Sequence, residues 1–112
     1  MSGISTHVLD TSRGCPAAGV PVVLERAVDS GWESVGRGIT DADGRAGGLF
    51  SSVPEEGRYR LNFDTGAYFR AVGEAGFFYP EVSVTFTVGH GEEHYHVPLL
   101  LSPFGYSTYR GS

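Results

Sequence analysis

Three histidines are placed where their imidazoles can meet on one surface. His7 lies in a segment with the period-two pattern of a β-strand, and His94 and His96 lie two positions apart in another such segment. Alternate residues of a strand point to the same face, so pairing of the two segments in one sheet would bring the three rings together. Because the pKa of histidine lies near neutral pH, this group predicts acid–base chemistry on a bound substrate.

Two metal sites are alternatives to acid–base chemistry. Three imidazoles can hold zinc in a catalytic His₃ site, and a chelator would then abolish activity. The Asp41-Ala42-Asp43-Gly44 run faintly resembles a calcium loop, but an EF-hand needs a ligand at the position of Ile39 and a later glutamate. We reject the calcium loop. Since neutral histidines can activate water unaided, we expect no metal and no cofactor.

The basic residues exclude several other classes of protein. All 8 are arginines, so Schiff-base chemistry, P-loop phosphate binding and serine–lysine dyads have no candidate lysine. No Gly-x-Ser-x-Gly elbow for a serine nucleophile is found. The net charge is −5 and the arginines are scattered, which argues against a nucleic-acid partner.

Composition favours a single globular domain, residues 1–112, in a reducing compartment. The one cysteine, Cys15, cannot form an internal disulfide, and we expect a cytoplasmic protein. Residues 1–8 lack a basic start followed by an apolar stretch, so we expect no signal peptide. No apolar run approaches the ~18 residues of a membrane helix, and we expect no membrane partner.

The pattern along the chain predicts an all-β fold. Period-two alternation with turn residues between segments is typical of strands, and Gly44 supplies the positive φ of a tight turn before Arg45. Asp64 and Thr65 predict the start of a short helix that ends near Val72. Eight short strands and one helical turn favour an antiparallel sandwich; the strands are expected at 3–9, 20–28, 32–39, 46–51, 58–63, 81–88, 94–101 and 106–110.

The predicted strand 94–101 is apolar on both faces. Tyr95, Val97, Leu99 and Leu101 form the natural core face, while Pro98 and Leu100 join the two histidines on the opposite face. Such a face is covered either by its own chain or by another subunit. A chain of 112 residues has little to spare, so we favour a subunit interface that contains the histidines.

Several motifs, in order along nearly the whole chain, resemble the transthyretin-related 5-hydroxyisourate hydrolases. Residues 5–10 (STHVLD) are similar to the opening signature of that family, and residues 40–45 (TDADGR) to its second motif. Residues 94–112, which end in Tyr-Arg-Gly-Ser, resemble its C-terminal signature. Asp64-Thr65 with Tyr68, and residues 78–82, also resemble the family.

The resemblance implies a fold, an assembly and a set of site residues. It implies an eight-stranded transthyretin-like sandwich with one short helix, assembled as a homotetramer (a dimer of dimers) with active sites between the dimers. The substrate would be 5-hydroxyisourate, an oxidised purine whose six-membered ring is opened by water. The catalytic residues carry over onto His7, Arg45, His96 and Ser112, and the substrate-binding residues onto His94, Tyr109, Arg110 and Gly111.

Chemistry is consistent with these roles and leaves two questions open. Histidines suit the activation of water and the delivery of a proton to the leaving nitrogen. A fixed guanidinium suits the stabilisation of negative charge on the attacked carbonyl. Which histidine is the base stays open, as does whether His94 touches the substrate. The non-enzymatic alternative is a carrier, because vertebrate transthyretins share this fold and bind thyroid hormone; they lack the histidines, the arginine and the Tyr-Arg-Gly-Ser ending.

Overall fold

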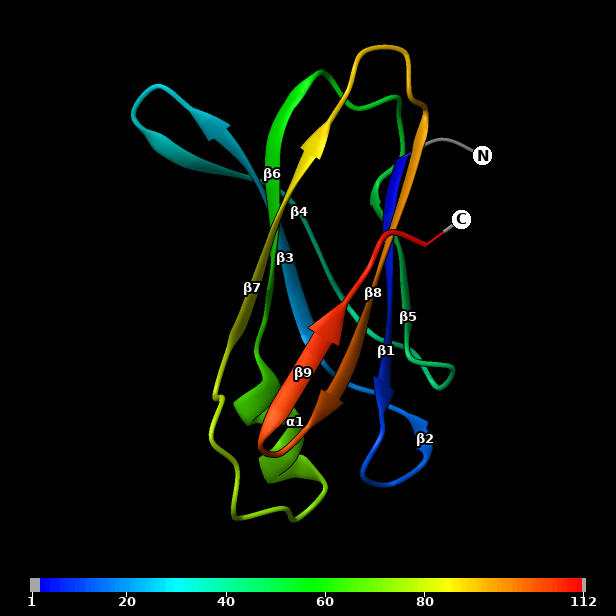
Figure 1. The fold of residues 1–112 in the computed structure, drawn as a ribbon, viewed down its shortest axis with the longest axis vertical. Coiled ribbons are helices and arrows are strands. Elements are labelled where there is room, and N and C mark those ends of the chain that lie inside the picture. Colours follow the sequence, from blue (N-terminus) through cyan, green and yellow to red (C-terminus); the bar gives the residue numbers. More distant parts are fainter. Residues whose placement is uncertain (1–2, 112) are drawn as a thin grey trace.

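Alternating apolar and polar residues fold this chain into two facing sheets with one short helix (Figure 1). The computed structural model describes residues 3–111. Within that range the elements are β1 (Gly3–Asp10), β2 (Cys15–Pro16), β3 (Pro21–Val28), β4 (Gly31–Ile39), β5 (Arg45–Phe50), β6 (Gly57–Phe63), α1 (Thr65–Ala71), β7 (Val82–Val88), β8 (His94–Ser102) and β9 (Gly105–Thr108). The predicted all-β sandwich with one helix is confirmed.

Two features differ from the predicted eight-stranded antiparallel sandwich. The ninth strand, β2, is a two-residue segment that pairs with Leu9 and Asp10, and it is too short to show a period. The second difference is that β1 pairs with β8 in parallel, from Gly3 opposite His94 to Asp10 opposite Leu101. Antiparallel pairing is needed only where a short turn joins two strands, whereas most of the chain separates β1 from β8.

The inner faces of the two sheets form the core. One sheet has the order β2-β1-β8-β9, with β5 also pairing with β1, and the other has the order β4-β3-β6-β7. The side chains of Val8 and Leu99 from the first sheet and of Leu24 and Leu61 from the second are fully buried. Removing such side chains from water drives the folding of the sandwich. The predicted core face of β8 is confirmed, because its four members are all buried.

The helix α1 closes one end of the sandwich (Figure 1). The Asp64 side chain accepts a hydrogen bond from the Ala67 backbone N–H at 3.0 Å, as the sequence predicts for the N-cap residue. From the helix, the buried Tyr68 hydroxyl donates to the carboxylate of Asp10 at 2.6 Å, which ties α1 to the end of β1. In the described part of the chain, no helix has the length and apolarity needed to cross a membrane.

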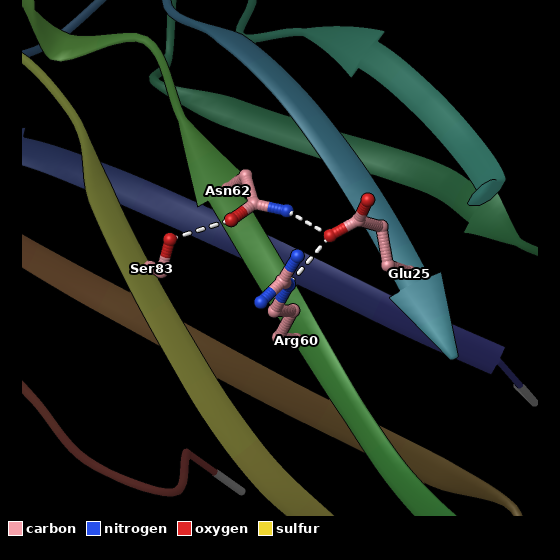
Figure 2. A network of polar contacts seen from close by, with 4 residues as sticks. All are labelled: Glu25, Arg60, Asn62 and Ser83. Atoms are coloured by element: carbon pink, nitrogen blue, oxygen red, sulfur yellow. Dashed lines mark hydrogen bonds and ion pairs between the residues drawn. The ribbon is translucent and has the colours of Figure 1, made fainter. Parts of the chain in front are cut away.

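The outer faces of the two sheets differ in chemistry. On the β3–β6–β7 side, Glu25 accepts hydrogen bonds from Arg60 and Asn62, and Ser83 donates to Asn62 (Figure 2). The Arg60 guanidinium also lies over the Trp32 ring, 4.3 Å from its centroid. Polar side chains on this face therefore bond to one another, whereas the outer face of β1 and β8 carries the histidines.

Candidate active site

Three neighbouring strands bring three of the four predicted catalytic residues, His7, Arg45 and His96, to one surface. Parallel pairing sets Ser5 opposite His96 and His7 opposite Pro98. On the other side of β1, antiparallel pairing with β5 sets Arg45 opposite His7. The His7 and His96 rings lie with their centroids 6.5 Å apart. The prediction that these histidines share one surface is therefore confirmed by the strand register.

The turn before β5 holds the His7 ring. Its Nε2 lies 2.9 Å from the Asp43 carbonyl oxygen. A carbonyl can only accept a hydrogen bond, so Nε2 carries the proton and donates, which leaves Nδ1 as the nitrogen that can gain or lose one. Gly44 packs this turn against β1: its φ is +78°, and a Cβ there would lie 2.4 Å from the Val8 carbonyl oxygen. Only glycine fits this position.

Asp41 organises the same turn from its first position. Its carboxylate accepts hydrogen bonds from the backbone N–H groups of Arg45 and Asp43, at 3.0 Å and 2.9 Å. The bond from Arg45 is the main reason why the pKa of Asp41 lies below its ordinary value. The carboxylate thus fixes the backbone that presents Arg45, a role that the sequence analysis missed.

The environment of His96 favours its neutral form. Burial comes first among the causes that lower its pKa below the ordinary value, followed by positive charge on His7, His94 and Arg45. Its Nδ1 lies 2.9 Å from the Ser5 hydroxyl. A neutral imidazole can accept a proton from water, so this arrangement suits a general base.

His94 lies at the edge of this group. It is half-buried, and within residues 3–111 its Nδ1 is buried and has no hydrogen-bond partner. Together with Ser5 it lines a hollow of about 250 Å³ between the first residues of β1 and the last residues of β5. Among residues 3–111, no three His, Cys, Asp or Glu side chains come together in a metal-binding arrangement. The zinc alternative therefore has no ligand set in this part of the chain.

The segment after β9 lies against His96. The Gly111 N–H donates to the His96 carbonyl oxygen at 2.8 Å. A Cβ added to Gly111 would lie 2.7 Å from Cδ2 of the His96 ring and 3.3 Å from Cγ of Pro98. Pro98 is already buried within its own chain, whereas the sequence pattern favoured cover by a partner subunit over the face of Pro98 and Leu100. That expectation was wrong for Pro98, because its own chain passes close enough to cover it.

Two other predicted binding residues take different directions. The Arg110 guanidinium lies over the ring of Tyr95, a core-face residue, at 4.7 Å from its centroid, and 3.8 Å from the Glu92 carboxylate. Arg110 and Tyr109 line a groove of about 240 Å³ between this segment and β7. In the described structure they flank the strand that carries His96, rather than joining Gly111 beside its ring. Ser112 lies outside the described residues.

Comparison with known proteins places this chain in a family. Residues 4–111 match the HIUase/Transthyretin family. The chain belongs to this family. A 5-hydroxyisourate hydrolase of Salmonella dublin is 49% identical over 110 residues, which cover 97% of this chain and 80% of that protein. The resemblance stated from the sequence motifs is thereby confirmed.

Solved structures of the family agree with the fold. The Klebsiella pneumoniae 5-hydroxyisourate hydrolase is 40% identical, with a TM-score of 0.86 and complete coverage of both chains. The transthyretin of Sparus aurata is 32% identical, with a TM-score of 0.87, and the match covers 99% of this chain and 97% of that one. The predicted transthyretin-like fold is therefore confirmed, and the fold is shared by proteins of both names.

Proposed function

We propose that this chain is a hydrolase that opens the six-membered ring of 5-hydroxyisourate, an oxidised purine in urate degradation. The product is 2-oxo-4-hydroxy-4-carboxy-5-ureidoimidazoline. The observation that carries the proposal is the closeness of three side chains: the ring centroids of His7 and His96 lie 6.5 Å apart, and Arg45 lies opposite His7 on the neighbouring strand. The names of the Salmonella and Klebsiella relatives support the substrate. Residues 1–112 would form one hydrolase domain.

The reaction needs one water and one proton relay. His96, held neutral by its surroundings, takes a proton from water while the water oxygen bonds to the attacked carbonyl carbon. Arg45 orients the ring and stabilises the negative charge on the carbonyl oxygen. The ring C–N bond then breaks, and the proton goes to the leaving nitrogen. The proposal requires neither a metal nor a cofactor.

His7 has a narrower role than His96. Its Nε2–H is engaged by the Asp43 carbonyl, so it can exchange a proton only through Nδ1. We assign the general base to His96 and the orientation of substrate or water to His7. His94 would contact the substrate from the edge of the group. Both assignments rest on the different hydrogen-bond partners of the two reactive rings.

The proposed assembly is a homotetramer with the site between dimers. Leu100 remains half-buried on the same face as His96, so a partner subunit would complete its burial. Gly111 and Ser112 would close the site, while Tyr109 and Arg110 would hold the segment in place. Ser112 would offer a hydroxyl to the substrate or to the attacking water.

A carrier of the transthyretin type is the alternative within the family. The similarity to the Sparus aurata protein shows that the fold does not separate the two functions. The side chains do: a carrier needs no neutral histidine beside a second histidine and an arginine. The hydrolase is therefore the function that this site supports best.

The decisive experiment measures the decay of freshly made 5-hydroxyisourate by ultraviolet spectroscopy, with urate oxidase producing it in place. The protein should accelerate decay well beyond the spontaneous rate. His7→Ala, Arg45→Ala and His96→Ala should each lower kcat/KM by about two orders of magnitude or more. His90→Ala is the matched control, since His90 lies in an exposed turn. Decay at the spontaneous rate with the parent protein would reject the proposal.

A further inference from the structure

The two reactive histidines have different kinds of hydrogen-bond partner. His7 faces the backbone carbonyl oxygen of Asp43, an acceptor that every residue type would supply at that position. His96 faces the side-chain hydroxyl of Ser5 across the β1–β8 pair. A hydroxyl is a neutral group that both donates and accepts hydrogen bonds. The side chain at position 5 therefore influences which ring nitrogen of His96 carries the proton.

A base at His96 needs a particular tautomer. If Nδ1 carries the proton and donates to the Ser5 oxygen, Nε2 has a free lone pair that can take a proton from water. When Nε2 then becomes protonated, Nδ1–H still donates to the same oxygen. One contact therefore serves both the base form and the acid form of His96, and the ring need not turn between them.

Ser5 also leaves the charge of the site unchanged. An aspartate beside a histidine stabilises the imidazolium and raises its pKa, whereas a hydroxyl orients the ring without a negative charge. The charged or titratable groups that face His96 are His7 from β1, Arg45 from β5 and His94 from β8, and all three favour the neutral ring. Arg110, from the segment after β9, is turned towards Tyr95.

We propose that Ser5 is a positioning residue for hydrolysis, which accepts a hydrogen bond from Nδ1–H of His96 and so presents Nε2 as the base. The inference rests on the proposed function for its catalytic meaning, but the tautomer itself is a property of the resting protein. Ser5 would act through His96, and the inference requires no contact between Ser5 and the substrate.

The first test reads the tautomer without any substrate. In ¹⁵N-labelled full-length protein, long-range ¹H–¹⁵N spectra distinguish protonated from unprotonated ring nitrogens, and His96→Gln identifies the His96 signals. The parent should show Nδ1–H at neutral pH. Ser5→Ala should return the ring towards Nε2–H, the form that neutral histidine prefers in water, and Ser5→Thr should retain Nδ1–H. A parent ring with Nε2–H, or the same tautomer in Ser5→Ala, would overturn the inference.

The second test reads turnover and its pH profile. Ser5→Ala should lower kcat about tenfold or more with little change in KM, and Ser5→Thr should recover most of it, as expected for partners that orient a reactive imidazole. Ser5→Asp should move the acid limb of kcat/KM to higher pH, because a carboxylate beside Nδ1 raises the pKa of His96. Parental kcat in Ser5→Ala, or an unmoved acid limb in Ser5→Asp, would overturn the inference.

The two tests separate this inference from the proposed function. A parent protein that leaves 5-hydroxyisourate to decay at its spontaneous rate would reject the function, and the spectra would still decide the hydrogen bond. If the parent is active but its His96 tautomer is the same in Ser5→Ala, the inference is rejected and the proposed function stands.

Discussion

Gly111 and His96 are joined through their backbones and touch through the ring. The Gly111 N–H donates to the His96 carbonyl oxygen, and the α-carbon of Gly111 lies so close to the imidazole that a Cβ would meet Cδ2 at 2.7 Å. Real Cβ atoms do not approach that closely. Glycine at this position therefore allows the segment to pass the reactive ring.

Gly111→Ala should impair catalysis far more than stability. The added methyl group must displace either the His96 ring or the segment beside it, so we expect kcat/KM to fall about tenfold or more. The melting temperature should stay within a few degrees of the parent. Gly105→Ala is the matched control, since its Cβ would meet only the Ser102 hydroxyl at 3.8 Å. Equal activities in the two variants would contradict the close approach.

Arg110 should act by holding this segment. Its contact with the Tyr95 ring contributes on the order of 0.5–1 kcal/mol, and its exposed pairing with Glu92 contributes little. Arg110→Ala should raise amide exchange at Gly111 and lower kcat/KM, while Glu92→Gln should change neither by much.

Deletion of residues 109–112 should lower turnover at least tenfold with the assembly intact. Parental turnover in the deletion variant would remove the segment from the site.

The pKa of His96 predicts the acid limb of activity. Because burial and nearby positive charge lower this pKa below 6.5, the neutral base persists at pH values where an ordinary histidine is already half protonated. The acid limb of kcat/KM should therefore have its midpoint below pH 6.5. His94→Gln removes one of the charges and should move that midpoint upward. A midpoint above 6.5 in the parent would contradict a neutral His96.

The buried Asp10 should make stability depend on pH below about 4. Burial opposes its charge, but hydrogen bonds from Tyr68, Ser12 and the Arg13 backbone outweigh burial and lower its pKa below 3.8. A depressed folded-state pKa stabilises the fold above the unfolded-state value, and this contribution is lost as pH falls through the folded-state value. The free energy of unfolding should decline in acid for this reason.

Tyr68→Phe tests that contact directly. Removing the hydroxyl leaves the carboxylate with one donor fewer and should lower the free energy of unfolding by about 1–3 kcal/mol at pH 7. Urea denaturation at pH 7 and in acid measures both effects. The loss should shrink as Asp10 becomes protonated. A loss that is the same at every pH would assign it to packing instead of to the carboxylate.

Leu100→Glu should disturb assembly without disturbing the fold. Leu100 is half-buried on the outer face of β8, where a partner subunit is proposed to cover it, and a charge there would be desolvated. Analytical ultracentrifugation should give about four times the 12.0 kDa chain mass for the parent and less for the variant. Ser34→Glu, at an exposed position of β4, is the control with the same charge change. A parent that sediments as a monomer would reject the interface site.

Sequence alone determined the strands better than it determined the contacts between them. Val82, Val84 and Val88 are buried as their alternation predicts, because one face of an outer strand must enter the core. Ser5 was missed as a partner of His96, although it shares the face of His7. Alternation assigns a face, whereas a partner also requires the register and direction of the neighbouring strand.

The path of residues 109–111 could not be predicted from the sequence pattern either. Motif similarity placed Tyr109, Arg110 and Gly111 together, but the backbone turns Gly111 to His96 and Arg110 to Tyr95. The burial of Pro98 follows from the same path. Such features depend on where a short irregular segment lies in space, and no periodicity encodes that.

The parallel pairing of β1 with β8 also dictates when the site can exist. Ser5 and His96 are separated by 91 positions, and Gly111 comes still later. During synthesis, the strand that carries His7 leaves the ribosome before β8 and has no β8 to pair with until residues 94–102 have emerged. A nascent chain therefore holds an unpaired β1 edge and no catalytic surface. Closing such a distant contact is slow compared with forming a hairpin, so activity should appear only after β8 and the segment that follows it have emerged and paired.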